Sequence, residues 1–147
     1  MFRDGRAQLV VFRLGHERFG IELSLLDEVV DALPLQRIPD APHDTLGVAM
    51  VRGSLVTVYD PRHLLRAGSG ESKAALLFVR GEHRAALAVD DVDDAMTITH
   101  DELRPAPGVG TDGILQGVVW RGQDLIAVLD GAALLEAMMA VSEGESR

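Results

Sequence analysis

The sequence of 147 residues contains no cysteine, which excludes disulfide bonds, thiol catalysis and zinc sites built on cysteine. It also has no apolar run near the ~20 residues that a membrane-spanning helix needs. The N-terminal residues Met1 to Arg6 are mostly polar and lack the hydrophobic region of a signal peptide. Because 47% of the residues are hydrophobic, we expect a folded globular protein, and we expect it to be cytoplasmic.

Aromatic and basic side chains are also scarce. Only 4% of the residues are aromatic, and the formal net charge is −9. Proteins that bind nucleic acid use clustered lysines and arginines to neutralise phosphates and aromatic rings to stack on bases. We therefore expect no nucleic acid partner. Because the chain has no apolar run long enough to span a bilayer, we also expect no insertion into a membrane.

The feature that organises the chain is a duplicated stretch, Gly47 to Asp60 and Gly117 to Asp130. Each copy reads as an apolar strand, a turn containing Arg-Gly, a second apolar strand and an aspartate, followed by a leucine pair. Glycine supplies the backbone freedom of a tight turn. Each aspartate suits a helix N-cap, and Pro61 suits the first helical position.

A second similarity precedes each copy, because the pattern Phe12-x-x-Gly15 recurs as Phe78-x-x-Gly81 in strands of alternating apolar residues. The repeat divides a single domain of residues 1–147 into two halves, 8–66 and 73–141, with a polar, glycine-rich linker at 67–72. A half of roughly 65–70 residues buries too little surface to be robust alone, so we expect a shared core. Many short strands predict an all-β fold of small barrels.

Two segments are predicted to be helical. After the first hairpin, four apolar residues recur at helical spacing: Leu25, Leu26, Val29 and Val30. Ser24 with Asp27 resembles a capping box, so a short helical turn is expected before Pro34. The second helix is expected from about Gly131 to Val141, with a stripe of Leu134, Leu135, Met138 and Met139.

The densest charge cluster consists of Asp90, Asp91, Asp93 and Asp94. Carboxylates are the ligands that Mg²⁺ and Ca²⁺ prefer, so one alternative is a small metal-dependent hydrolase that uses this cluster. The cluster lacks the spacing and the central glycine of an EF-hand, and a solvated turn is the simpler interpretation. The histidines and serines fit no known metal-ligand or nucleophile motif. We therefore expect no catalytic residue, no cofactor and no metal site, and a protein that is not an enzyme.

Two charged residues, Glu28 and Arg52, are each set among apolar neighbours. An unpaired charge that is buried is costly, so a partly buried ion pair between them is one interpretation. Two independent surface charges are the other.

The residues collected above resemble the CheW family, the adaptor proteins of bacterial chemosensory arrays. The resemblance covers about residues 8–140. The matching segments are Leu9 to Gly15, Phe19 to Ile21, Asp27 to Val29, Ile38 to Pro42, Gly47-Val48, Arg52-Gly53, Val56 to Asp60 with Arg62, Val89 to Val92, Leu103 to Pro107, and Gly117 to Asp130.

The resemblance implies two SH3-like five-stranded β-barrels that share a core, with short helices including one at the C-terminus. It also implies a scaffold without catalysis. CheW-like domains couple the cytoplasmic tip of a chemoreceptor, a methyl-accepting chemotaxis protein, to the regulatory domain of a CheA-type histidine kinase, in arrays on the inner face of the membrane. The resemblance places Leu26, Glu28, Gly47, Val48 and Arg52 at a partner-binding groove, and it favours the ion pair between Glu28 and Arg52.

The chain departs from the family pattern at a few positions. Thr57 stands where the family usually has proline, and Pro61 replaces the leucine of its Asp-Leu-Arg motif. Ala49 and Met50 occupy the area where an asparagine commonly precedes Arg-Gly. These departures leave open a reduced adaptor that binds only the receptor or only the kinase in a specialised pathway.

Overall fold

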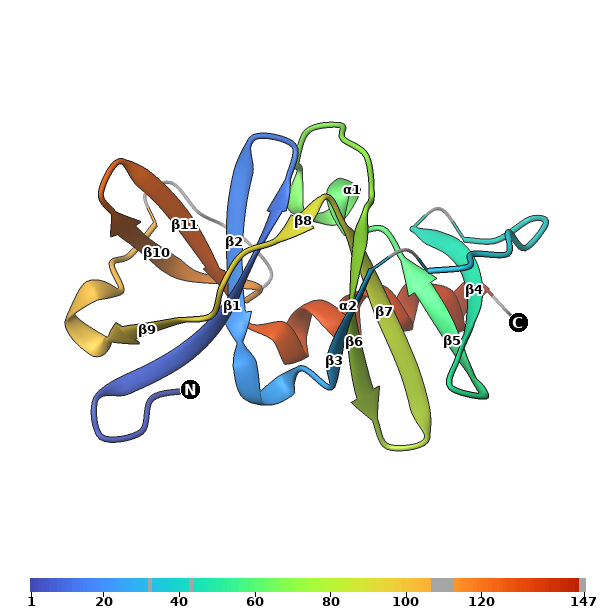
Figure 1. The fold of residues 1–147 in the computed structure, drawn as a ribbon, viewed down its shortest axis with the longest axis horizontal. Coiled ribbons are helices and arrows are strands. Elements are labelled where there is room, and N and C mark those ends of the chain that lie inside the picture. The colour runs from blue at the N-terminus through green and yellow to red at the C-terminus, as the bar shows by residue number, and fades with distance from the viewer. Residues whose placement is uncertain (32, 43, 107–112, 146–147) are drawn as a thin grey trace.

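The computed structural model describes residues 1–31, 33–42, 44–106 and 113–145, and its strands form two sheets that lie side by side (Figure 1). Sheet A contains β1 (Arg6–Leu14), β2 (Glu17–Glu22), β8 (Asp91–Val92), β9 (Met96–Thr99), β10 (Leu115–Arg121) and β11 (Asp124–Leu129). Sheet B contains β3 (Glu28–Asp31), β4 (Thr45–Val51), β5 (Ser54–Tyr59), β6 (Ala74–Arg80) and β7 (His83–Val89). The helical elements are η1 (Leu23–Leu25), α1 (Arg62–Leu65), η2 (His100–Glu102) and α2 (Gly131–Glu145). Pro107, the last residue of the matching segment Leu103 to Pro107, lies outside the described residues.

The predicted all-β class is confirmed, although the barrels are curled sheets that are not closed by strand ladders. Sheet B has the order β3-β6-β7-β5-β4, and sheet A has the order β10-β11-β2-β1 with β8 and β9 both paired to β1. Isolated bridges bring the remaining edges together, Gln36 with Val48 in sheet B and Arg104 with Val118 in sheet A. Sheet B therefore has the predicted five strands, and sheet A has six.

The two sheets do not coincide with the predicted halves, residues 8–66 and 73–141. β2 of the first half pairs in parallel with β11 of the second, where Phe19 faces Ala127. β7 of the second half pairs in parallel with β5 of the first, where Ala86 faces Val58. Each half thus gives one hairpin to the sheet of the other half. The exchange pairs the backbone groups of the inner strands β2 and β7, which an isolated hairpin would leave without partners on one side.

The shared core expected from the sequence lies between the sheets and is covered by α2 (Figure 1). Alternate residues of β1 and β6 point into it, including the fully buried Phe12 and Phe78. Leu134, Leu135 and Met138 of α2 pack against the same cluster, which confirms most of the predicted stripe. One smaller apolar cluster fills the inside of each sheet.

The helical prediction after the first hairpin was right for one short turn and wrong for its cap and for the valines that follow. Only Leu23–Leu25 forms a 3-10 helix, and no side chain caps it. Val29 and Val30 instead lie in β3, which pairs with β6, and the N–H of Asp27 donates to the carbonyl of Leu77. β-branched residues fit a strand ladder well, and the pairing with β6 outweighs the local helical pattern.

The two repeated aspartates bind the first turns of their helices. Asp130 Oδ1 accepts a hydrogen bond from the N–H of Ala133 at 3.1 Å, which confirms it as the cap of α2. Asp60 Oδ1 accepts from the N–H of Arg62 at 3.0 Å, although α1 itself begins at Arg62 and not at Pro61. In both copies the aspartate satisfies a donor that the helix leaves free.

Asp130→Ala is expected to lower the free energy of unfolding by about 0.5–2 kcal/mol, because the N–H of Ala133 loses its acceptor. Asp130→Asn keeps an oxygen in the same place and should lose much less. Urea denaturation followed by circular dichroism measures both. Equal losses for the two variants would show that the charge, and not the capping oxygen, stabilises the helix.

Candidate partner-binding site

Glu28 and Arg52 form an ion pair across the open side of sheet B. Arg52 Nη2 lies 2.9 Å from Glu28 Oε2. Glu28 begins β3 and Arg52 follows β4, and these strands are the two outer strands of the sheet. The pair therefore joins two edges that the strand ladder leaves apart.

The turn between β4 and β5 directs Arg52 toward Glu28. Val51 faces Ser54 across a two-residue turn, and both turn residues have positive φ angles, +50° for Arg52 and +78° for Gly53. Such turns match the twist of the strands they join. An arginine in the left-handed region of backbone conformation is uncommon. Here it occupies the first position of the turn, and the second is a glycine, which adopts a positive φ easily.

The two partners of the ion pair differ in exposure, and only Glu28 is partly buried. The side chain of Glu28 is 22% exposed, whereas that of Arg52 is 79% exposed. Solvent screens an exposed guanidinium, so the pair itself contributes little to stability. The carboxylate is more costly to leave alone, because it is partly removed from water. The predicted ion pair is thus confirmed as a contact, with Glu28 as its less exposed partner.

The other three predicted site residues have different surroundings. Val48 exchanges two backbone hydrogen bonds with Gln36, at 2.9 and 2.7 Å. A Cβ on Gly47 would lie 2.1 Å from the carbonyl oxygen of Gln36, so only glycine lets these segments approach so closely. Leu26 packs partly buried against the shared core. The structure joins Glu28 with Arg52 and places Gly47 and Val48 together beside Gln36.

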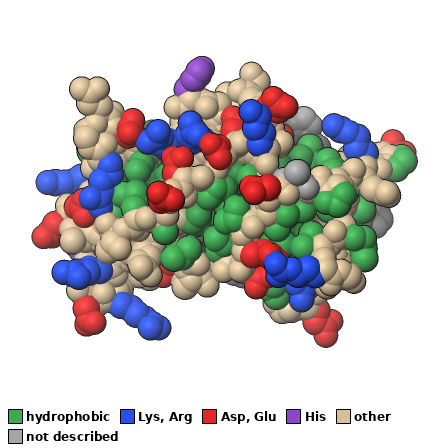
Figure 2. Space-filling model, in the orientation of Figure 1, with side chains coloured by type: hydrophobic (Ala, Val, Ile, Leu, Met, Phe, Trp, Pro, Cys, Tyr) green, Lys and Arg blue, Asp and Glu red, His purple; other side chains and the backbone are tan. Residues whose placement is uncertain are grey.

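The hairpins β4–β5 and β10–β11 carry exposed apolar side chains that were not predicted from the sequence. Figure 2 shows green apolar side chains along the middle of one face, between the hairpins that lie at the two ends of the molecule in Figure 1. Apart from Met1 at the N-terminus, the exposed large apolar side chains of the described residues are Val29, Ile38, Met50, Leu55, Val79, Trp120 and Leu125. Met50 faces Leu55 across β4 and β5, and Trp120 faces Leu125 at the matching place in β10 and β11. The repeat alignment contained this signal, because each copy keeps an apolar pair where an outward side chain is expected.

Arg121 bridges sheet A much as Arg52 bridges sheet B. Its Nη2 donates to the carbonyl oxygen of Thr97 in β9 at 2.5 Å and lies 3.2 Å from Glu102 Oε2. β9 and β10 lie at opposite sides of sheet A. The two Arg-Gly pairs are offset by one position, since Arg121 ends a strand and Arg52 lies within the turn. In each sheet, an arginine from the repeated hairpin therefore contacts the opposite edge across the open side.

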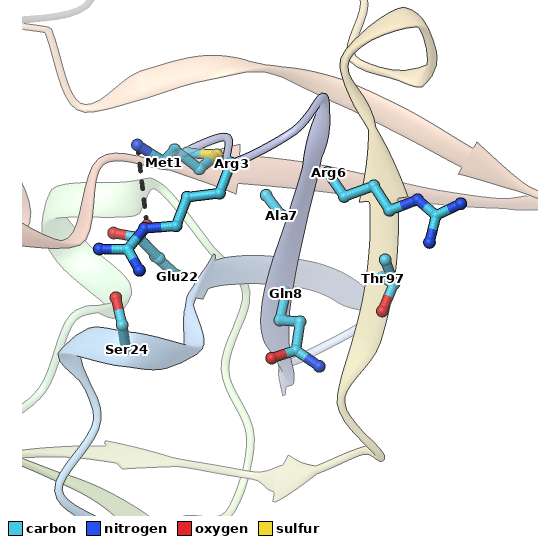
Figure 3. Close-up of a pocket in the computed structure, with 8 residues that line it drawn as sticks. All are labelled: Met1, Arg3, Arg6, Ala7, Gln8, Glu22, Ser24 and Thr97. Carbon is cyan, nitrogen blue, oxygen red and sulfur yellow. Dashed lines mark ion pairs between the residues drawn. The ribbon is translucent and has the colours of Figure 1, made fainter.

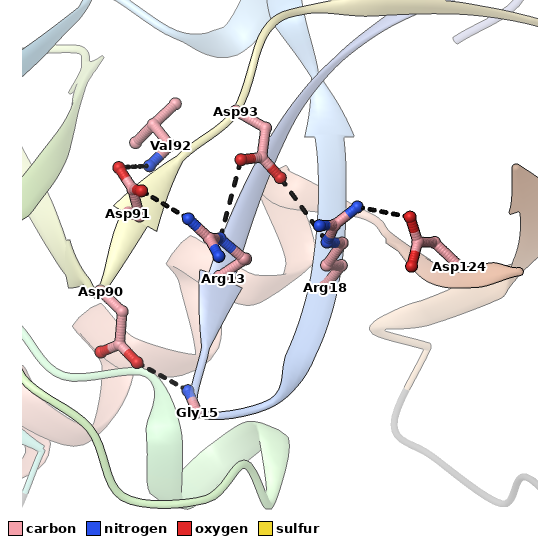
Figure 4. A network of polar contacts seen from close by, with 8 residues as sticks. All are labelled: Arg13, Gly15, Arg18, Asp90, Asp91, Val92, Asp93 and Asp124. Atoms are coloured by element: carbon pink, nitrogen blue, oxygen red, sulfur yellow. Dashed lines mark hydrogen bonds and ion pairs between the residues drawn. The ribbon is translucent and has the colours of Figure 1, made fainter.

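The aspartate cluster forms a row of ion pairs on sheet A (Figure 4). Asp91 pairs with Arg13, and Asp93 lies between Arg13 and Arg18, at 3.6 and 3.7 Å. Arg18 continues the row to Asp124 at 2.8 Å. The N–H of Val92 and then the Arg13 guanidinium hold the pKa of Asp91 below its usual range, so this carboxylate stays ionised to lower pH.

This arrangement does not support the alternative of a metal-dependent hydrolase. The carboxylates of Asp91 and Asp93 face guanidinium groups, and Asp90 turns away to accept a hydrogen bond from Gly15. Within the part of the chain that the structure describes, no three histidine or carboxylate side chains converge as metal ligands would.

A charged hollow of about 540 Å³ lies beside the N-terminus (Figure 3). It is lined by Met1, Arg3, Arg6, Ala7, Gln8, Glu22, Ser24 and Thr97. The terminal amine lies 3.7 Å from Glu22 Oε1, and Arg6 points away from this pair in Figure 3. None of the five predicted site residues lines this hollow.

In the described residues, no helix combines the length and apolar character needed to cross a membrane.

Comparisons with known proteins agree with this fold. A family model described as the CheW-like domain matches residues 8–139. The probable chemotaxis protein CheW of Rhizobium etli is 24% identical over 97% of this chain and 94% of its own length. The chemotaxis protein CheW of Treponema pallidum is 28% identical over 86% of this chain and 81% of its own length.

A solved structure has a similar fold. It is the crystal structure of the scaffolding protein TtCheW from Thermoanaerobacter tengcongensis, with a TM-score of 0.73 and 23% sequence identity. The similarity covers 84% of this chain and 88% of that one.

Proposed function

The chain belongs to the CheW-like domain family of non-enzymatic chemotaxis adaptors, and we propose that it couples a chemoreceptor to a CheA-type histidine kinase. In this proposal it binds the cytoplasmic tip of the receptor on one face and the regulatory domain of the kinase on another. It acts at receptor arrays on the inner face of the membrane. The observation that carries the proposal is the Glu28–Arg52 ion pair across the open side of sheet B.

The surroundings of the ion pair suit a helical partner. A receptor tip offers an amphipathic helix, whose apolar side needs an apolar surface and whose polar side needs charged groups at its margin. Val29 follows Glu28 in β3 and is 41% exposed, and Met50, two residues before Arg52, is 55% exposed. The ion pair then fixes the distance between the two edges that carry these apolar side chains.

The second exposed apolar pair favours a coupling protein over a reduced adaptor. Met50 and Leu55 belong to sheet B, and Trp120 and Leu125 belong to sheet A. Exposed large apolar side chains that lie next to each other often mark interaction surfaces. Two such pairs on separate sheets give the receptor and the kinase separate places to bind. Separate pull-downs with a receptor tip fragment and a kinase regulatory domain test this, and capture of only one of them would support the reduced adaptor.

Arg52→Ala is expected to weaken binding of the receptor tip by about 1–2 kcal/mol, roughly a tenfold rise in Kd, because Glu28 is left without its partner. The double variant Glu28→Arg with Arg52→Glu should recover part of what either single reversal loses. Titration calorimetry at one fixed salt concentration measures the affinity of the wild type, of Arg52→Ala, of both single reversals and of the double variant.

Arg6→Ala is the matched control, since Arg6 is an exposed arginine of sheet A and should leave the affinity unchanged. A coupling energy of zero in the Glu28–Arg52 cycle would show that the two charges act separately, and the role given to the ion pair would be wrong.

A further inference from the structure

Within the described residues, the strands cross from one sheet to the other twice, and the two connections differ in composition. The first runs from β2 to β3 through η1, where Leu23 and Leu25 pack against the shared core. The second runs from β7 to β8 and consists of one residue, Asp90. The first crossing is apolar, and the second is charged.

Asp90 is held by three groups from different parts of the fold. Its N–H donates to the carbonyl oxygen of Arg13 at 3.0 Å. Its Oδ2 accepts from the N–H of Gly15 at 2.7 Å, as Figure 4 shows, and its Oδ1 accepts from Arg62 Nη2. Arg13 and Gly15 belong to the β1–β2 hairpin of sheet A, whereas Arg62 follows β5 of sheet B. One side chain therefore joins the two sheets where the chain crosses.

Arg62 completes the contact from sheet B. Its Nη1 donates to the carbonyl oxygen of Gly68 in the linker at 3.0 Å, and its Nε lies 3.7 Å from Asp60 Oδ1. The side chains of Arg62 and Asp90 are only 12% and 18% exposed. Two charges so far removed from water are costly to separate, because each would be left partly desolvated.

The linker is shaped to pass over this pair. A Cβ on Gly70 would lie 2.1 Å from Asp90 Oδ2. A Cβ on Gly15 would lie 3.2 Å from the backbone of Gly68, and Gly15 also has a φ of +62°. Gly15 and Gly70 thus let the segment 67–72 pack closely against the pair, where the sequence predicted only a linker.

The first crossing has no counterpart of this ion pair. When the repeats are aligned on Phe12 and Phe78, Ser24 takes the place of Asp90. When they are aligned on Asp60 and Asp130, Ala132 takes the place of Arg62. The charged contact is therefore not a requirement of the repeated fold, since the other half folds without it.

We propose that the Arg62–Asp90 ion pair is a latch that fixes the angle between the two sheets, with the apolar crossing at η1 as the pivot. Rigid units commonly rotate about a few residues at the ends of elements, and a polar contact far from the pivot limits that rotation. An open latch lets the sheets shift while the shared core stays buried. The proposal does not depend on which partner each sheet binds.

The absence of cysteine makes the test direct, because two introduced cysteines are the only sites for spin labels. Lys73→Cys reports on sheet B, since Lys73 is exposed and its N–H is bonded to the carbonyl of Val89. Gln123→Cys reports on sheet A, from the exposed turn between β10 and β11. Double electron–electron resonance gives the distribution of distances between the two labels.

With Arg62 intact, one narrow distribution is expected. Arg62→Ala and Asp90→Asn should each broaden it or add a second, longer distance. Arg52→Ala removes an ion pair within sheet B and should leave the distribution unchanged. If Arg62→Ala does not fold, Gly70→Ala tests the same point, because its Cβ displaces the Asp90 carboxylate from Arg62.

Distributions in Asp90→Asn and Gly70→Ala that match the parent protein in mean and width would overturn the latch. Failure of every latch variant to fold would also overturn it, because the pair would then be a requirement of folding and not a control of the sheet angle.

Discussion

Gly47→Ala is expected to lower the free energy of unfolding by about 3–5 kcal/mol. Gly47 lies in a β-bulge of β4 and has a φ of +154°. A Cβ at this residue would lie 2.1 Å from the oxygen and 2.9 Å from the carbon of the Gln36 carbonyl. Because both atoms belong to the backbone, no side chain can rotate away to relieve the clash.

The relief available to the Gly47→Ala protein is to move the segment around Gln36 away from β4. That movement breaks the two hydrogen bonds between Gln36 and Val48, which close sheet B at this side. Gly117 repeats the arrangement in sheet A, where a Cβ would lie 2.5 Å from the carbonyl oxygen of Arg104. Gly117→Ala should therefore show a similar loss.

Gly81→Ala is the matched control for the glycine series. Gly81 has a φ of +61°, but its Cβ would meet no atom of the described residues within 4 Å apart from its chain neighbours, so only the backbone conformation is strained. The expected loss is about 1–2 kcal/mol. Urea denaturation followed by circular dichroism compares the three variants. Losses of the same size for Gly47 and Gly81 would show that close approach to Gln36 is not what requires glycine at residue 47.

Phe12→Ala and Phe78→Ala are each expected to cost about 3–5 kcal/mol and to shift a single unfolding transition. Phe12 lies in β1 of sheet A and Phe78 in β6 of sheet B, and both are almost fully buried in the shared core. Phe12 also stacks on Phe19, with ring centroids 5.7 Å apart. Because hairpins are exchanged between the halves, loss of either ring weakens both sheets.

Scanning calorimetry tests this second prediction, because it separates one cooperative transition from two. Leu55→Ala is the control, since Leu55 is apolar but 61% exposed and should change stability by less than about 0.5 kcal/mol. Two transitions, only one of which moves in Phe12→Ala, would show that the sheets unfold independently in spite of the shared core.

Local features were the most predictable from the sequence. The turn at Arg52-Gly53 and the cap at Asp130 depend on neighbouring residues and on backbone conformation. Such requirements act on a few adjacent residues, so the residue types themselves report them. The resemblance to the CheW family added the pairing of Glu28 with Arg52, which spacing alone had left open.

The segment around residues 24–30 shows where local reasoning was insufficient. Its apolar residues fit a helix and a strand about equally well over so short a length. Val29 and Val30 became strand residues because β6 offered a ladder of hydrogen bonds at that place. The decisive partner lies more than 40 positions away in the sequence, as the pairing of Val29 with Leu76 shows.

By itself, the sequence determined the repeated hairpins, their turns and the aspartates that start the helices. Only the tertiary structure decided which hairpins pair with each other. The two halves carry the same strand pattern, so β2 could pair within its own half or with β11, and the sequence does not distinguish these choices. Burial of Phe12 and Phe78 in one core favours the exchanged pairing, and that exchange also brings Asp90 to Arg62 and Arg121 to Thr97.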